Sequence, residues 1–169
     1  MKIAKMDSFT VSVPYRWRES SARVRRDGVT AVLLRLQTDD GLIGWGECCP
    51  GPNVESVREA ADSAAPILIG RDPWNSEQLA HHYFHTAHWD LRQMTGNFAY
   101  AGIDMALRDI QGKACGQPLY RLFGGLVRKE VEYFCYLSAG SPDSVVAQAL
   151  KAKAAGYRVY YLKEGTNFD

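Results

Sequence analysis

The sequence has no long apolar run and no excess of charge of one sign. No segment approaches the roughly 20 consecutive apolar residues of a membrane-spanning helix. Near the start of the chain, the polar residues Lys5, Asp7 and Ser8 interrupt the apolar residues before they can form the core of a signal peptide. The 20 basic and 19 acidic side chains give a net charge of +1, which excludes a whole-chain attraction to nucleic acid or to an anionic membrane. These absences predict a cytoplasmic protein with neither a nucleic-acid nor a membrane partner.

Cysteine is scarce and is poorly spaced for a disulfide framework. The four cysteines, Cys48, Cys49, Cys115 and Cys135, include no C-x-x-C pair, and the sequence has no N-x-[ST] glycosylation site. We therefore expect free thiols in a reducing compartment. A content of 46% apolar and 23% charged residues excludes intrinsic disorder and predicts a globular core.

The histidines form an incomplete metal motif. His81, His85 and His88 would share one face of a helix, a spacing that a metal ion could use. However, His82 occupies the position at which the zinc-protease motif H-E-x-x-H needs its glutamate. We expect a polar stripe on a half-exposed helix and no hydrolase.

A dinucleotide-binding fingerprint also fails. Gly44 and Gly46 follow a predicted strand, but Cys49 replaces the third glycine and Pro50 follows it. Because no helix begins there, we do not expect a dinucleotide enzyme.

Strand patterns dominate the first third of the chain and helical spacing dominates the middle. Apolar and branched residues predict strands over residues 3–13, 30–37 and 42–46, with a turn at residues 38–41. Apolar residues three and four apart predict helices over residues 54–69 and 99–114, and from residue 75 or 76 onward.

The pattern changes after Gly125. Residues 131–137 are strand-like, a helix capped by Ser141 and Pro142 extends to residue 155, and a second strand covers residues 157–165. A strand, helix and strand in this order predict two parallel strands joined by a crossover helix. Because such a unit cannot cover both faces of its own sheet, we expect it to be the first repeat of a longer α/β structure.

Residues 15–27 form a basic segment that also contains aromatic residues. Five arginines stand there against two acidic residues. One interpretation is a solvated mobile loop. The other is a flap that meets an anionic small molecule, because arginine binds a carboxylate with two parallel hydrogen bonds.

Two stretches resemble the mandelate racemase and muconate lactonizing enzyme family of the enolase superfamily. Residues 103–125 (IDMALRDIQGKACGQPLYRLFGG) are similar to the family's G-K-x-x-G-x-P-L-x-x-L-x-G-G stretch, and residues 38–47 (TDDGLIGWGE) to its N-terminal hairpin. The resemblance implies an α+β capping domain over residues 1–125. Residues 126–169 would then be the first strand, helix and second strand of a (β/α)-barrel that is incomplete in this chain.

The resemblance also implies a catalytic residue. The family's active-site lysines form a K-x-K pattern at the end of the second barrel strand, which here is Tyr161-Leu162-Lys163. Lys163 matches the second lysine, the base that removes a proton next to a carboxylate. Tyr161 replaces the first lysine, and Glu164 stands where the family usually has an apolar residue. Without the resemblance, Lys163 would be interpreted as a solvated residue at a strand end.

The resemblance further implies Mg²⁺ and a small carboxylate substrate. The family's metal ligands lie on later barrel strands, so we expect them beyond residue 169 and name none in this chain. Two capping-domain loops, residues 15–27 and 47–53, would select the substrate, and Tyr15, Arg16 and Trp17 join Tyr161 as candidate substrate-binding residues. Arginines beside a tryptophan favour a sugar acid or hydroxy acid.

The complete protein would then be a racemase or an acid-sugar or hydroxy-acid dehydratase that acts through an enediolate, and we expect it to be a homo-oligomer. The 169-residue chain alone is expected to be inactive. The alternative is a binding or assembly module without catalysis, because the chain lacks the metal-binding strands.

Overall fold

The computed structural model describes residues 1–21, 24–51, 53–86 and 94–163. The chain divides into two compact units. The first contains Met1–Ser12 and Thr30–Leu126, and the second contains Val13–Val29 and Val127–Asp169. The end of the N-terminal hairpin thus belongs to the second unit, whereas the domain boundary after Gly125 stays a prediction.

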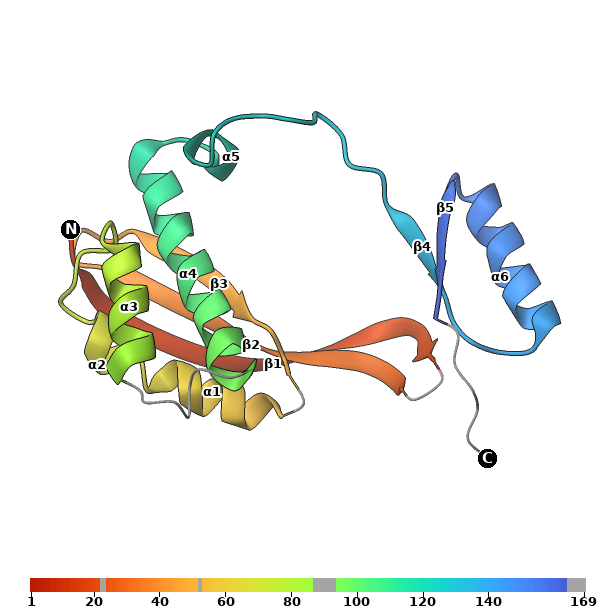
Figure 1. Cartoon of the computed structure of the whole chain (residues 1–169), viewed down its shortest axis with the longest axis horizontal. Coiled ribbons are helices and arrows are strands. Elements are labelled where there is room, and N and C mark those ends of the chain that lie inside the picture. Colours follow the sequence, from red (N-terminus) through yellow and green to blue (C-terminus); the bar gives the residue numbers. More distant parts are fainter. Residues whose placement is uncertain (22–23, 52, 87–93, 164–169) are drawn as a thin grey trace. The chain divides into compact units, whose positions relative to one another are not determined.

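The first unit contains a three-stranded sheet in the order β1-β2-β3 (Figure 1). The strands are β1 (Ile3–Ser20), β2 (Arg25–Thr38) and β3 (Ile43–Cys48). Strands β2 and β3 pair antiparallel, from Val32 opposite Cys48 to Gln37 opposite Ile43. In the second half of β2 the alternate residues Val32, Leu34 and Leu36 are fully buried, as expected for a sheet with one face on a core. The predicted hairpin is confirmed.

The helices of this unit cover the sheet and enclose the core, apart from the last of them, which has no buried residue. They are α1 (Val54–Asp62), α2 (Ala65–Leu68), α3 (Ser76–Thr86), α4 (Met94–Cys115) and α5 (Leu119–Leu122). The prediction of one helix over residues 54–69 is wrong. Pro66 lies in the first turn of α2, and because proline lacks an N–H and disfavours a helical residue before it, the helix restarts there. None of the helices described here and below is long and apolar enough to cross a membrane.

Helix α4 packs on β3 and α1. Ile103, Leu107 and Ile110 of α4 are fully buried in the core. A Cβ atom added to Gly44 or Gly46 would collide with the backbone of α4, at Ala106 and Gly102. These two glycines therefore let the helix approach the strand. This packing role explains why glycine stands at both positions of the partial dinucleotide-binding motif.

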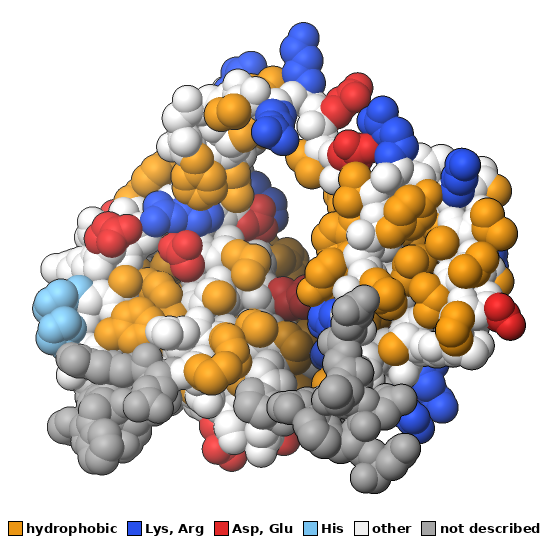
Figure 2. Space-filling model, turned by 45° about the vertical axis from the view of Figure 1, so that its right-hand side comes forward, with side chains coloured by type: hydrophobic (Ala, Val, Ile, Leu, Met, Phe, Trp, Pro, Cys, Tyr) orange, Lys and Arg blue, Asp and Glu red, His pale blue; other side chains and the backbone are white. Residues whose placement is uncertain are grey.

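The second unit contains a strand, a helix and a parallel strand: β4 (Phe134–Leu137), α6 (Pro142–Ala154) and β5 (Val159–Leu162). The Ser141 side chain accepts a hydrogen bond from the Ser144 N–H and caps α6. The predicted β-α-β unit is confirmed, although both strands are shorter than predicted. Many apolar side chains of this unit are exposed, and Figure 2 shows them spread over its surface.

Candidate functional site

Four side chains meet on one face of the β4–β5 sheet. Tyr136 of β4 lies opposite Tyr161 of β5, and their ring centroids are 5.9 Å apart. Phe134 contacts Tyr161 at 5.2 Å between centroids. Lys163 follows the last residue of β5, and its Nζ lies 5.7 Å from the Tyr136 ring centroid and 6.0 Å from that of Tyr161. The lysine ammonium therefore lies against two aromatic rings at the carboxyl end of the parallel strands.

The predicted flap is an extension of the hairpin. The expectation of a loop over residues 15–27 is wrong, because β1 continues to Ser20 and β2 begins at Arg25. We call residues 13–20 and 25–29 the hairpin arm.

Ion pairs join the two strands of the hairpin arm. Arg18 makes two hydrogen bonds to Asp27, from Nε at 2.6 Å and from Nη2 at 2.9 Å, and Arg26 pairs with Glu19 at 3.4 Å. The Arg18 guanidinium lowers the pKa of the Asp27 carboxyl. Opposite charges across the strands therefore offset the repulsion between the arginines. The basic segment can form paired strands for this reason.

The hairpin arm binds to the end of β4. The Tyr136 hydroxyl donates to the Ser20 carbonyl at 3.2 Å, and the Ala139 N–H donates to the same carbonyl at 2.8 Å. The Ser138 hydroxyl donates to the Arg18 carbonyl at 3.0 Å. All three hydrogen bonds end on two backbone oxygens of β1, those of Arg18 and Ser20, so the contact depends on the extended form of the arm.

A cavity of about 470 Å³ lies between the hairpin arm and Tyr136. Its lining consists of Pro14, Tyr15, Arg16, Trp17, Glu19 and Tyr136. The structure thus brings together the three candidate substrate-binding residues of the arm. Arg16 has no ion pair within the described part of the chain, so its guanidinium is available to a ligand. Trp17 is 65% exposed and contributes an aromatic side chain to the lining of the same cavity.

Sequence reasoning missed Tyr136, which touches both halves of this site. Its ring lies beside Lys163 and Tyr161, and its hydroxyl reaches the hairpin arm. Partial burial raises the pKa of this hydroxyl, so it remains a hydrogen-bond donor at neutral pH. The signal that could have found it is the strand register, because a residue opposite Tyr161 on a parallel strand shares its face.

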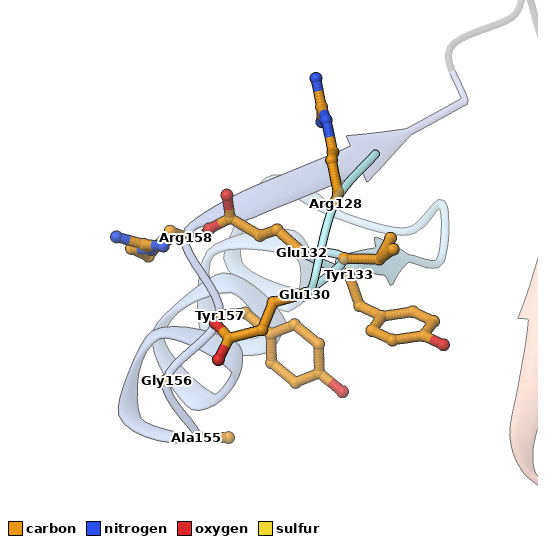
Figure 3. A pocket seen from close by; sticks show the side chains of 9 residues that line it. Arg128, Glu130, Glu132, Tyr133, Ala155, Gly156, Tyr157 and Arg158 are labelled. Atoms are coloured by element: carbon orange, nitrogen blue, oxygen red, sulfur yellow. Dashed lines mark hydrogen bonds and ion pairs between the residues drawn. The ribbon is translucent and has the colours of Figure 1, made fainter. Parts of the chain in front are cut away.

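A larger cavity, of about 550 Å³, lies at the other end of the parallel strands. Figure 3 shows its lining, which includes Arg128, Glu130 and the exposed ion pair between Arg158 and Glu132, at 2.8 Å. These residues precede β4 and β5, whereas Lys163 follows β5. The cavity is therefore separate from the Lys163 site.

The described residues contain no group of three or more His, Cys, Asp or Glu side chains that could hold a metal ion. The His81 and His85 rings stack with centroids 3.8 Å apart on α3, while His88 lies outside the described residues, as does Glu164. In the second predicted capping loop, the Asn53 side chain accepts from the Glu55 and Ser56 N–H groups and caps α1. We therefore assign no metal ligand among the described residues.

Comparisons with known proteins agree with this architecture. Residues 7–124 match the family described as mandelate racemase / muconate lactonizing enzyme, N-terminal domain. A D-galactonate dehydratase of Verminephrobacter eiseniae is 32% identical over 96% of the chain and 38% of the dehydratase. The crystal structure of an N-succinyl Arg/Lys racemase from Bacillus cereus has a TM-score of 0.89 at 28% identity, over 99% of this chain and 45% of the racemase.

A third relative was solved with a metal ion. It is a member of the enolase superfamily from Roseovarius nubinhibens complexed with magnesium, with a TM-score of 0.82 at 29% identity, over 98% of this chain and 45% of that chain. The chain spans less than half the length of each of these three relatives. By its sequence, its fold and these similarities, the chain belongs to the mandelate racemase / muconate lactonizing enzyme family of the enolase superfamily.

Proposed function

We propose that the full-length protein is an enzyme that removes the proton α to the carboxylate of a small acid and forms an enediolate. The reaction would be a racemisation or the dehydration of an acid sugar or hydroxy acid. Support comes from the relatives, which include a dehydratase and a racemase. The observation that carries the proposal is Lys163 Nζ at the carboxyl end of β5, within about 6 Å of the rings of Tyr136 and Tyr161.

Lys163 is the proposed base. In its neutral form the Nζ atom accepts the α-proton, and the electron pair of the C–H bond moves into the carboxylate to give the enediolate. The resulting ammonium then lies against the faces of Tyr136 and Tyr161, where the ring electrons favour a cation. Tyr161 differs from a second lysine because its phenol donates a hydrogen bond without adding charge.

The hairpin arm is the proposed substrate-recognition element. Arg16 would donate hydrogen bonds to a carboxylate or hydroxyl oxygen of the substrate, since its guanidinium has no ion pair among the residues described. Tyr15 and Trp17 line the same cavity and would cover the carbon chain of the acid. Such a combination suits a polar acid better than a purely apolar one.

We further propose that the full-length protein uses Mg²⁺, as the magnesium complex of a relative supports. The described residues do not form a site for the ion, so its ligands would lie outside them, and no step above depends on it. When bound, Mg²⁺ supplies positive charge that stabilises an enediolate.

The test is the substitution Lys163→Ala in the full-length protein. Exchange of the substrate α-proton is measured by NMR in deuterated water with a panel of sugar acids and hydroxy acids. Loss of the base should slow exchange by at least about 10² to 10⁴-fold. Tyr161→Phe should have a milder effect, because only a hydrogen bond is lost.

Lys153→Ala is the matched control, since Lys153 is exposed on α6 and makes no ion pair within the described ranges. It should exchange the α-proton at the parent rate, and circular dichroism should show that all three variants fold. If Lys163→Ala also exchanges at the parent rate, the base lies elsewhere.

A further inference from the structure

We infer that Tyr136 is a positioning residue that couples the binding of the hairpin arm to the placement of the Lys163 amine. The coupling follows from contacts in the second unit and does not require the reaction proposed above. Its consequence for catalysis does rest on that proposed function.

The first half of the coupling is the aromatic contact. Lys163 Nζ lies 5.7 Å from the centroid of the Tyr136 ring, and the same ring packs against Tyr161. Lys163 follows β5 and makes no ion pair among the described residues. The position of its amine therefore depends on the two rings beside it.

The second half is the hydroxyl contact. The Tyr136 hydroxyl donates to the Ser20 carbonyl of the hairpin arm. The two residues are 116 positions apart in the sequence. Three donors near the end of β4 bind the arm. Of these three, the Tyr136 hydroxyl is the one whose side chain also lies beside Lys163. The Ala139 N–H and the Ser138 hydroxyl attach the arm without contacting the lysine.

One rigid side chain therefore joins the arm to the lysine. A tyrosine has only two side-chain torsions, so fixing its hydroxyl on Ser20 also fixes the orientation of its ring. When the arm leaves β4, the hydroxyl loses its acceptor and the ring beside Lys163 becomes free to turn. Closure of the arm over the cavity would thus place the amine and the substrate-recognition residues together.

The test uses the full-length protein with two substitutions at this position. Tyr136→Phe removes the hydroxyl and keeps the ring, whereas Tyr136→Leu removes both. Tyr160→Phe is the matched control. Its hydroxyl bonds locally to the Tyr157 carbonyl, and its side chain lies on the opposite face of β5 from Tyr161.

Two readouts are independent of activity. Limited trypsin digestion followed by mass spectrometry measures cleavage at Arg16, Arg18, Arg25 and Arg26 of the hairpin arm. Brief labelling with acetic anhydride, followed by peptide mass spectrometry, measures the reactivity of Lys163. Loss of the hydroxyl bond should raise arm cleavage in Tyr136→Phe about fivefold, since cleavage follows the population of the open form. It should also change the labelling rate of Lys163.

The kinetic readout separates the two halves of the contact. On an acid for which the parent enzyme exchanges the α-proton, Tyr136→Phe should raise KM and also lower kcat, because the ring beside Lys163 remains but is no longer held in its orientation. Tyr136→Leu should lower kcat further, because it removes the ring as well. Tyr160→Phe should match the parent in every measurement.

Faster cleavage of the arm with unchanged labelling of Lys163 in Tyr136→Phe would show two independent contacts and overturn the coupling. Parent-like cleavage would also overturn it. If the parent exchanges no α-proton in any acid tested, the proposed function fails, while cleavage and labelling still decide the coupling. Tyr136→Phe retains the packing of the ring, so the test does not depend on whether Tyr136→Leu folds.

Discussion

Asp7 pairs with two cations, Lys5 on its own strand and Arg35 on the neighbouring strand. Its carboxylate lies 2.9 Å from Lys5 Nζ within β1 and 2.6 Å from Arg35 Nη2 of β2, so the Arg35 pair joins the two strands. Hydrogen bonds from Lys5 and Arg35 lower the pKa of this carboxyl in the folded chain. Because the folded pKa lies below the unfolded one, the stabilisation is complete above the ordinary aspartate pKa of about 3.9 and is lost as the pH falls below it.

We predict that Asp7→Asn lowers the melting temperature at pH 7 and that the difference from the parent disappears near pH 2. Thermal unfolding followed by circular dichroism between pH 2 and pH 7 measures this. Glu59→Gln is the control, because Glu59 is exposed on α1 and has no ion pair in the described part of the chain. A difference between Asp7→Asn and the parent that stays constant down to pH 2 would show that the charge on Asp7 is not responsible.

At the residue scale, sequence patterns found the side chains that one strand or one segment presents. Lys163 and Tyr161 follow from alternation together with the family resemblance, and Tyr15, Arg16 and Trp17 from local composition. The structure places the last three around one cavity. Tyr136 was missed because its role depends on the register between β4 and β5 and on a contact with Ser20, which no local pattern records.

At the element scale, the packing of α4 on β3 depends on three glycines. A Cβ atom on Gly102 of α4 would lie 2.6 Å from the Cys48 sulfur and 2.8 Å from its backbone nitrogen. A Cβ atom on Gly46 would collide with the carbonyl of Gly102, and one on Gly44 with that of Ala106. Lys113 then fixes the helix, because its Nζ donates to the Ile43 carbonyl and to Asp109, each at 2.7 Å.

We predict that Gly46→Ala lowers the free energy of unfolding by about 3 kcal/mol, because the whole helix must move away from the strand. Chemical denaturation of the full-length protein measures this. Gly140→Ala is the matched control and should cost less than about 1 kcal/mol. Its Cβ would meet only the Ser144 side chain, at 3.2 Å and beyond, and that side chain can rotate. Equal losses in the two variants would contradict the close approach.

The elements themselves were mostly predictable, and the errors have physical causes. Helical spacing predicted α4 and α6, and strand patterns predicted β2 and β3. The hairpin arm was predicted as a loop because five arginines in a short segment suggest a solvated chain. The cross-strand pairs of Arg18 with Asp27 and Arg26 with Glu19 offset that repulsion, and they become visible only once the strands are paired.

At the scale of the whole molecule, the two units differ in how much apolar surface they bury. The main hydrophobic cluster, which includes Ile3, Val32 and Ile110, lies entirely in the first unit. In the second unit, Leu137 and Ala152 are the buried apolar residues among those described. Phe134 and Leu150, by contrast, are 56% and 62% exposed. Exposed apolar area of this kind promotes association.

We predict that the 169-residue chain, expressed by itself, folds poorly and self-associates through its second unit. The first unit has a core that can unfold cooperatively, whereas the exposed side chains of β4, β5 and α6 remain in water, as Figure 2 illustrates. The chain should bind a hydrophobic dye, and its sedimentation should depend on concentration. Backbone amides of β4 and β5 should exchange hydrogen faster than those of α4, because local opening costs less where little apolar area is buried. A monomer that binds no dye and unfolds in one transition would contradict this, since the second unit would then be stable without further packing.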